Sequence, residues 1–411
     1  MSYTTQGSVT PLYLTDGAAP PVYLTTGQQV INRTGSTAEA PVVDTSTLTA
    51  TAKQVAKLTI INGVSASKSP DGGETAICRV TFASDATNLR FWLRALPAGT
   101  RGTFHLGGGV YPLQAAGNTV MAGDVLTDPL ADIAVAAGTS AEVRLFFPAG
   151  SAKSVTKVPM EKSGFLAGEH LVAGSFSASA AATFSPYGVL GDTTEGARSI
   201  MCDGDSILTK DWHRSVLVGA GFAVSDRGVW GIQVNSWDPL FGGALARSPW
   251  DYFLFELGTN NSGAPQPATF QKAIDAMYRY ADAGALGAQT TLLPRSTSTD
   301  RWATVEGQTP SISPEWREDW NAWVRDGSPV DSQRKWVAPG TPGALRAGDP
   351  GHMLAFPCFD LAASVEVPAA GAHVWAAGAL TDDGTHPTDA GVALMRSAFG
   401  QYVARVWGVA Q

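Results

Sequence analysis

The sequence predicts an α/β protein in which a parallel, doubly wound domain follows a β-rich domain. From about residue 195, strand-like runs alternate with helical patterns, as they do in parallel sheets with helical crossovers. Before residue 190 the apolar runs are short and separated by turn residues, which is typical of a β-sandwich or jelly roll. We therefore expect an N-terminal arm (1–40), a β-sandwich domain (41–190) and an α/β domain (191–411).

The arm contains a short repeat. Residues 11–17 read Pro-Leu-Tyr-Leu-Thr-Asp-Gly and recur at 21–27 as Pro-Val-Tyr-Leu-Thr-Thr-Gly. Each copy joins an alternating apolar run to a glycine turn, and two copies are too few for a solenoid. We expect a partner or the protein's own oligomer to order this arm; a free terminal tail is the alternative.

Short runs rich in β-branched and aromatic residues predict the strands of the β-rich domain. They lie at 57–61, 76–82, 89–93 and 143–147, between clusters of Gly, Asp, Asn and Pro. Such a domain can be a scaffold, a carbohydrate-binding module or an assembly module. The sequence leaves these three roles open.

In the α/β domain the pattern changes to strands and helices. Strands are predicted at 198–202, 252–257, 290–294 and 355–360, and helices at 270–283 and from about 388 to 407. Another helix is predicted to start at Ser313 and Pro314, because serine is a good cap and proline suits the first helical position. Trp316, Trp320 and Trp323 then share one face of it, and we interpret this stripe as core.

Three short polar blocks accompany these elements. Gly-Asp-Ser (204–206) follows one strand, where a helix is expected to begin, and Gly-Thr-Asn-Asn (258–261) follows another. Asp-Gly-Thr-His (383–386) precedes the last helix. The carboxyl ends of parallel strands meet at one edge of the sheet, so we expect the blocks to converge. A serine, an imidazole with a carboxylate, and an amide are the parts of a nucleophilic acyl-transfer site.

This order of blocks resembles the SGNH (GDSL-type) hydrolase superfamily of lipases, esterases and carbohydrate esterases. The family also has a glycine block of Asn, four residues and Gly, whose spacing residues 226–231 (Asp-Arg-Gly-Val-Trp-Gly) fit. The resemblance covers roughly residues 190–411 and implies a flavodoxin-like parallel sheet. It also implies that Ser206 is the nucleophile, His386 the general base and Asp383 the residue that orients His386.

The resemblance further implies an oxyanion hole. Its donors would be the backbone amides of Ser206 and Gly231, with Gly228 as the fallback for Gly231, and the side chain of Asn260. Two positions depart from the family pattern. Asp replaces the usual Asn at 226, and Asn replaces the usual Asp at 261. Both departures bear on loop geometry more than on the chemistry.

Other readings of these residues are weaker. The Gly-x-Ser-x-Gly motif is absent around Ser206, which argues against the α/β-hydrolase fold. Asp383 and His386 as zinc ligands would need further Cys or His residues nearby, so no metal and no cofactor is expected. Cys78, Cys202 and Cys358 lie far apart in apolar stretches and are interpreted as small buried hydrophobic residues.

Composition narrows the function classes. The 28 Lys and Arg residues are outnumbered by 36 Asp and Glu, and they form no basic stripe, so a nucleic-acid partner is not expected. No stretch approaches the roughly 20 apolar residues of a membrane span. The N-terminus lacks the basic and apolar regions of a secretory signal. Together with the odd cysteine count, this predicts synthesis in the cytoplasm.

These observations predict a serine esterase that removes acyl groups, chiefly O-acetyl, from a polysaccharide. Trp302 and Trp336 lie in polar contexts and are candidates to stack on a sugar ring. The layout of arm, β-domain and hydrolase domain resembles phage and prophage tail-fibre or spike proteins. That resemblance implies a homo-oligomer such as a trimer, attached to a particle through residues 1–40 and acting at a host cell surface. The alternatives are a non-catalytic receptor-binding or structural protein with a degenerate hydrolase domain, and an intracellular lipase or thioesterase.

Overall fold

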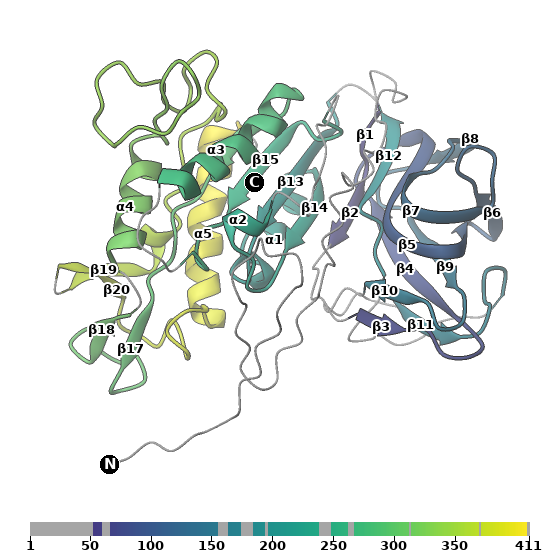
Figure 1. Cartoon of the computed structure of the whole chain (residues 1–411), viewed down its shortest axis with the longest axis horizontal. Coiled ribbons are helices and arrows are strands. Elements are labelled where there is room, and N and C mark those ends of the chain that lie inside the picture. Colours follow the sequence, from purple (N-terminus) through teal and green to yellow (C-terminus); the bar gives the residue numbers. More distant parts are fainter. Residues whose placement is uncertain are drawn as a thin grey trace, which may run out of the picture.

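The computed structural model describes residues 52–59, 66–154, 163–173, 184–193, 196–237, 248–261, 267–311, 314–369 and 371–408. The arm predicted over residues 1–40 lies outside these ranges. A curled antiparallel sheet and an α/β part lie next to each other along the long axis of the molecule (Figure 1). The mixed α/β fold class predicted from the sequence is confirmed.

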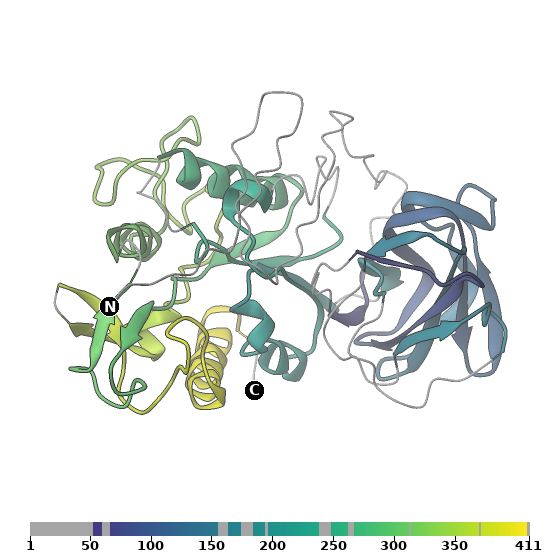
Figure 2. The ribbon, with the colours of Figure 1, turned by 60° about the horizontal axis from the view of Figure 1, so that its bottom comes forward.

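The antiparallel part is organised around one long strand, β5 (Ala86–Leu106), which pairs with β6, β7, β8, β9 and β12. The register shifts at several points where β5 pairs with β7 and β8. Such bulges bend a strand, and the sheet curls upon itself (Figure 2). The other strands here are β1 (Ala52–Gln54), β4 (Glu74–Phe82), β6 (Gly109–Leu113), β7 (Val120–Leu126), β8 (Leu130–Val135), β9 (Ser140–Phe147), β11 (Gly164–Ala167) and β12 (Gly188–Thr193), while β3 (Ala66–Lys68) pairs with β10 (Ala152–Ser154).

This arrangement differs from the β-sandwich or jelly roll predicted over 41–190. The predicted runs at 76–82, 89–93 and 143–147 do lie in β4, β5 and β9. The sequence pattern predicted separate strands of ordinary length, whereas β5 continues through 21 residues and serves both sides of the curl. The described strands are joined in one hydrogen-bonded, curled sheet, and the predicted sandwich or jelly roll is not confirmed.

The α/β part is built on parallel strands in the order β2-β14-β13-β15-β16. They are β2 (Ala56–Thr59), β13 (Arg198–Gly204), β14 (Phe222–Gly228), β15 (Tyr252–Glu256) and β16 (Leu286–Gln289). Two of them match the predicted runs at 198–202 and 252–257. The run at 57–61, which was predicted for the β-rich domain, lies in β2 and pairs parallel with β14. Because both neighbours of β13 run parallel to it, the loops after β13, β14 and β15 leave the sheet at one edge.

Helices cover both faces of these parallel strands. Ile200 and Cys202 of β13 pack in a core with α1 and α5, whereas Met201 between them packs in the core that includes α3. Successive strand residues point to opposite faces, and Figure 2 shows α3 and α4 on one side and α5 on the other. The helices are α1 (Arg214–Gly219), α2 (Val234–Trp237), α3 (Pro267–Asp282), α4 (Pro314–Arg325) and α5 (Asp389–Val406), with two strand pairs, β17 (Ser296–Ser298) with β18 (Gln308–Pro310) and β19 (Glu366–Ala369) with β20 (Ala372–Trp375).

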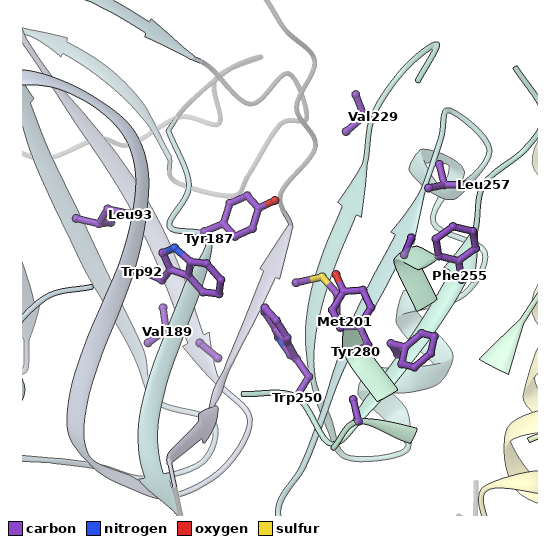
Figure 3. Packing of buried hydrophobic residues seen from close by; sticks show 14 of the residues in the cluster. Trp92, Leu93, Tyr187, Val189, Met201, Val229, Trp250, Phe255, Leu257 and Tyr280 are labelled. Atoms are coloured by element: carbon purple, nitrogen blue, oxygen red, sulfur yellow. The ribbon is translucent and has the colours of Figure 1, made fainter. Parts of the chain in front are cut away.

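The two parts share a sheet and a core. β2 pairs parallel with β14 and antiparallel with β4, so the described strands of both parts join in one sheet. Trp92 and Tyr187 of the antiparallel part face Trp250 and Tyr280 across the junction (Figure 3), with the centroids of Trp92 and Trp250 5.9 Å apart. The boundary predicted after residue 190 falls inside β12.

Three predicted elements differ from the structure. The strand predicted at 290–294 lies earlier, as β16, because the chain turns at Gly284 (φ +95°) and enters the sheet at once. The run at 355–360 makes only one bridge, between Phe359 and Thr290, since Pro357 has no N–H for a ladder. The helix expected after Ser206 is a 3₁₀ turn, Leu208–Lys210, and α1 follows it.

The predicted helices agree more closely. The helix predicted at 270–283 is α3, and the last one is α5, where the Thr388 side chain accepts a hydrogen bond from the Gly391 amide at 3.4 Å. Pro314 begins α4, and Ser313, the predicted cap, lies outside the described residues. The tryptophan stripe of α4 is buried around Phe270, which confirms that it is core.

Candidate active site

Ser206 lies just beyond the carboxyl end of β13. Gly204 pairs with Gly228 of β14 on one side and with Glu256 of β15 on the other. A Cβ on Gly204 would lie 2.5 Å from Glu256 Oε2 and 2.6 Å from Leu208 Cβ. Only glycine therefore lets the chain turn here, and the turn places Ser206 at the sheet edge with 8% of its surface exposed.

Ser206, His386 and Asp383 form a continuous hydrogen-bonded chain. Ser206 Oγ is 2.8 Å from His386 Nε2, and His386 Nδ1 is 2.6 Å from Asp383 Oδ2. When Nδ1 donates its proton to the carboxylate, Nε2 is left as an acceptor for the serine proton. The structure thus brings residues 180 positions apart in the chain into the geometry of an activated nucleophile.

The backbone of its own loop holds the Asp383 carboxylate. The amides of Thr385 and His386 donate to Asp383 Oδ1 at 2.8 and 2.7 Å. Partial burial raises the pKa of Asp383, but these donors and the His386 ring outweigh burial, so the pKa lies below its usual value. Asp383 is therefore ionised at neutral pH and can fix the orientation of the imidazole.

Gly384 locks this loop against β17. Its φ is +78°, the Ser296 amide donates to the Gly384 carbonyl at 3.0 Å, and a Cβ on Gly384 would lie 1.8 Å from the Ser296 carbonyl oxygen. We expect Gly384→Ala to lower the free energy of unfolding by about 2–5 kcal/mol, because overpacking adds to left-handed backbone strain.

Gly340 offers a matched control for this prediction. Its φ is +77°, and a Cβ there would meet no atom within 4 Å. Gly340→Ala should therefore cost only the strain, about 1–2 kcal/mol. Urea unfolding of both variants measures the difference, and equal losses would show that the contact with Ser296 relaxes freely.

A pair of buried carboxylates lies beneath Ser206. Asp205 and Glu256 are 0% and 1% exposed, and the Asp205 amide donates to Glu256 Oε2 at 3.2 Å. Burial raises the pKa of Asp205 to about 6, against the opposing effect of hydrogen bonds and of His386. Burial and the charge of Asp205 raise the pKa of Glu256 well above its usual value. Of the two, Glu256 is thus the member whose charged form is disfavoured both by burial and by the charge of its neighbour.

Sequence reasoning did not single out Glu256. It is the only charged residue in the apolar run 252–257. The signal that could have identified Glu256 is its place at the end of a buried strand that leads to the polar block at 258–261. A carboxyl group in such a place needs a hydrogen-bonding or charged partner.

The predicted oxyanion residue Asn260 contacts the two residues that follow the glycine block. Asn260 Nδ2 donates to the Ile232 carbonyl at 3.0 Å, and Gln233 Nε2 donates to the Asn260 carbonyl at 3.0 Å. Val229 follows β14 and its amide donates to the Gly204 carbonyl at 3.0 Å. The glycine block is therefore hydrogen-bonded to Gly204, and the two residues after the block are hydrogen-bonded to Asn260.

The two glycines predicted as backbone donors differ in exposure. Gly228 is buried, and a Cβ on it would meet Thr209 Cγ2 at 2.7 Å and the Asp205 carbonyl oxygen at 3.1 Å. Gly231 is exposed with φ +71°, and a Cβ on it would meet nothing within 4 Å. Gly231 is thus the one that faces open space, while Gly228 packs against the turn that carries Ser206.

The two departures from the family pattern have local structural roles. Asp226 Oδ2 lies 3.1 Å from Nε2 of the buried His213, at the start of α1. Asn261 Oδ1 accepts a hydrogen bond from the Val234 amide at 2.9 Å, at the start of α2. An asparagine oxygen can serve the second role as well as an aspartate oxygen can.

The structure separates the two tryptophans predicted to bind sugar. Trp302 is half-buried, its indole N–H donates to Ser296 Oγ at 3.0 Å, and its ring edge would lie 2.9 Å from a Cβ on Gly384. It therefore packs beside the loop that carries His386. Trp336 packs against Phe270, with ring centroids 5.3 Å apart, in the aromatic cluster between α3 and α4.

The described ranges contain neither a cluster of metal ligands nor a helix that could span a membrane. No group of three or more His, Cys, Asp or Glu side chains is placed there to hold a metal ion. None of the helices described combines the length and the apolar character that crossing a membrane requires.

No protein-family model and no curated protein matches the chain. Among solved structures it is similar to a GDSL-like lipase from Bacteroides thetaiotaomicron (16% identity over 51% of this chain and 88% of that one, TM-score 0.32). It is also similar to a lipase/acylhydrolase from Enterococcus faecalis (19%, 51% and 97%, TM-score 0.30). Protein YxiM from Bacillus subtilis matches more of it (14%, 88% and 89%, TM-score 0.33). Such identities and TM-scores are too low to assign an activity, which has to come from the side chains of this site.

Proposed function

We propose that this chain is a serine ester hydrolase. The observation that carries the proposal is the hydrogen-bonded chain from Ser206 through His386 to Asp383, with contacts of 2.8 and 2.6 Å. A serine hydroxyl becomes a useful nucleophile when an oriented imidazole takes its proton. The loop amides that hold Asp383 and the depressed pKa of its carboxyl keep that imidazole oriented at neutral pH.

In the proposed mechanism Ser206 Oγ attacks the ester carbonyl while His386 Nε2 takes its proton. The resulting imidazolium, stabilised by Asp383, protonates the alcohol as the C–O bond breaks. A water molecule then attacks the acyl-enzyme, giving its proton to His386, and Ser206 leaves with that proton. One ester and one water become one alcohol and one acid.

The proposed oxyanion hole uses the backbone amides of Ser206 and Gly231 and the Asn260 side chain. The exposure of Gly231 and the hydrogen bond from Asn260 to the adjacent Ile232 support this choice. Removing one such donor typically lowers kcat about 10²–10³-fold. Gly228, which is buried, is not used.

We further propose that the physiological substrate is an acylated polysaccharide and that the acyl group is acetyl. Trp302 supports this, because its ring packs beside the loop of His386 and a flat aromatic residue suits a sugar ring. Trp336 is not carried into the substrate site, since Phe270 and its neighbours occupy one side of it.

A tail-fibre or spike component attached through residues 1–40 is the proposed setting. This proposal rests on the order of the parts along the chain, in which the arm comes first, the β-rich part second and the hydrolase part last. Light scattering of the full chain checks the oligomer this setting implies, and a monomer would count heavily against it.

Hydrolysis of p-nitrophenyl acetate and p-nitrophenyl butyrate tests the proposed function. We expect turnover that favours acetate, and stoichiometric labelling of Ser206 by phenylmethylsulfonyl fluoride, located by mass spectrometry. Release of acetate from acetylated polysaccharides is the next measurement. Absence of both turnover and labelling would favour the alternative of a non-catalytic binding protein.

Asp383→Asn is expected to lower kcat/KM about 10²–10⁴-fold with the fold intact. The amide keeps an oxygen for the two loop N–H groups but no longer favours the tautomer in which His386 accepts the serine proton. Kinetics with p-nitrophenyl acetate and a thermal unfolding scan separate the two effects. An unchanged kcat/KM would show that Asp383 does not orient His386.

A further inference from the structure

One exposed aromatic side chain stands beside the proposed site. Among the described residues the large hydrophobic side chains exposed to solvent are Val110, Val120, Val172, Trp230, Leu286 and Leu394. Trp230 is the one aromatic member of this set and is 66% exposed. Single exposed hydrophobic residues are ordinary, so the position of Trp230 decides its meaning.

The glycine block presents Trp230 at the edge of the sheet where Ser206 lies. On one side of it, Val229 is buried and bound to the Gly204 carbonyl. On the other side, Ile232 is buried and its carbonyl accepts the Asn260 side chain. Val229 and Leu257, which follow β14 and β15, lie at this same end of the strands (Figure 3).

The turn directs the indole outward into open space. Val229 and Ile232 point into the core, and Gly231 between Trp230 and Ile232 has φ +71°. A Cβ on Gly231 would meet no atom within 4 Å. The exposed indole therefore directly precedes Gly231, the proposed backbone donor, whose Cβ position is open.

We propose that Trp230 is the platform on which a sugar ring of the ester's alcohol part stacks. This inference rests on the proposed function and names its substrate class. A sugar ring has apolar C–H faces and a rim of oxygen substituents, free or acylated, so it can cover one flat indole face while that rim stays in water. A fatty acyl chain would stay half exposed on a single open face and instead needs an enclosing apolar pocket.

Kinetics with two acetyl esters test the platform. Ethyl acetate carries no ring, whereas glucose pentaacetate presents a sugar ring. We expect Trp230→Ala to raise KM about tenfold more for glucose pentaacetate than for ethyl acetate, a difference of about 1.4 kcal/mol. Trp230→Phe should recover most of the loss, because it keeps a flat ring.

Leu286→Ala is the matched control. Leu286 is 45% exposed and begins β16, at the opposite end of the parallel strands, so its loss should change neither KM. Equal effects of Trp230→Ala on both esters, or none on either, would overturn the platform role.

A binding measurement separates failure of this inference from failure of the proposed function. In the Ser206→Ala background, calorimetric titration with glucose pentaacetate should show a Kd about tenfold higher when Trp230 is also alanine. If the wild type turns over neither ester but this difference persists, the hydrolase proposal is wrong and the platform stands. If Ser206→Ala and the double variant Ser206→Ala, Trp230→Ala bind glucose pentaacetate with the same Kd, the platform role is wrong, whether or not the wild type turns over either ester.

Discussion

Ser206→Ala, His386→Ala and the double variant are each expected to lower kcat/KM for p-nitrophenyl acetate by about 10⁴–10⁶-fold. The two side chains act as one unit, because the 2.8 Å contact between Ser206 Oγ and His386 Nε2 is the path by which the nucleophile loses its proton. Once either partner is removed, the other has no remaining part in the attack. The losses should therefore coincide rather than multiply.

The double variant supplies the sharpest test of this unit. If the losses multiplied, the two residues would act independently, and the proposed proton transfer between them would be wrong. Circular dichroism and unfolding midpoints of the three variants serve as the control for folding. Residual hydrolysis above the rate in buffer would come from the oxyanion donors and from binding.

The convergence of Ser206, His386 and Asp383 could be predicted from the places of their blocks along the chain. Gly-Asp-Ser and Gly-Thr-Asn-Asn each follow an apolar run, and parallel pairing of β13 with β15 brings the ends of those runs together. The Asp-x-x-His spacing allowed one loop to present both side chains, as it does. These are local signals joined by one rule about parallel sheets.

What the sequence could not give depends on packing between distant segments. The burial of Glu256 against Asp205 depends on strand register. The exposure of Trp230, as against the partial burial of Trp302 and Trp336, depends on which neighbours cover each indole. The curl of the β-rich part was missed for a similar reason, because no local pattern shows that one long strand will bend and pair with strands on both of its edges.

Removal of the Arg227 side chain is expected to cause the largest loss of stability. Arg227 and Asp203 are a fully buried ion pair at the junction of the two parts. The guanidinium also donates to the hydroxyls of Tyr187 and Tyr280 at 2.6 and 2.7 Å, and the Tyr280 hydroxyl donates to Asp203 Oδ2 at 2.5 Å. Arg227→Met leaves Asp203 as an uncompensated buried charge, which typically costs about 3–5 kcal/mol.

The pKa values of the pair sharpen this prediction. Burial raises the pKa of Asp203 even though Arg227 opposes the shift. For Arg227, burial lowers the pKa, but the charge and hydrogen bond of Asp203 together with Tyr187 and Tyr280 outweigh burial, so the pKa is raised. Arg227 therefore offsets only part of the cost of burying the Asp203 carboxylate. Without Arg227 the pKa of Asp203 should rise further, so the Arg227→Met loss should be smaller at pH 5 than at pH 8.

Two companion variants separate charge from packing in urea unfolding. Asp203→Asn added to Arg227→Met should restore part of the lost free energy of unfolding, because the amide carries no charge yet keeps an oxygen for Tyr280. Arg334→Met breaks an ion pair with Asp282 whose side chains are 49% and 54% exposed, and such pairs contribute about 0–1 kcal/mol. Equal losses for Arg227→Met and Arg334→Met would show that the buried pair contributes no more than a surface pair.

Because Asp203 and Arg227 directly precede Gly204 and Gly228, the same variants also report whether the junction between the two parts supports the turn that holds Ser206.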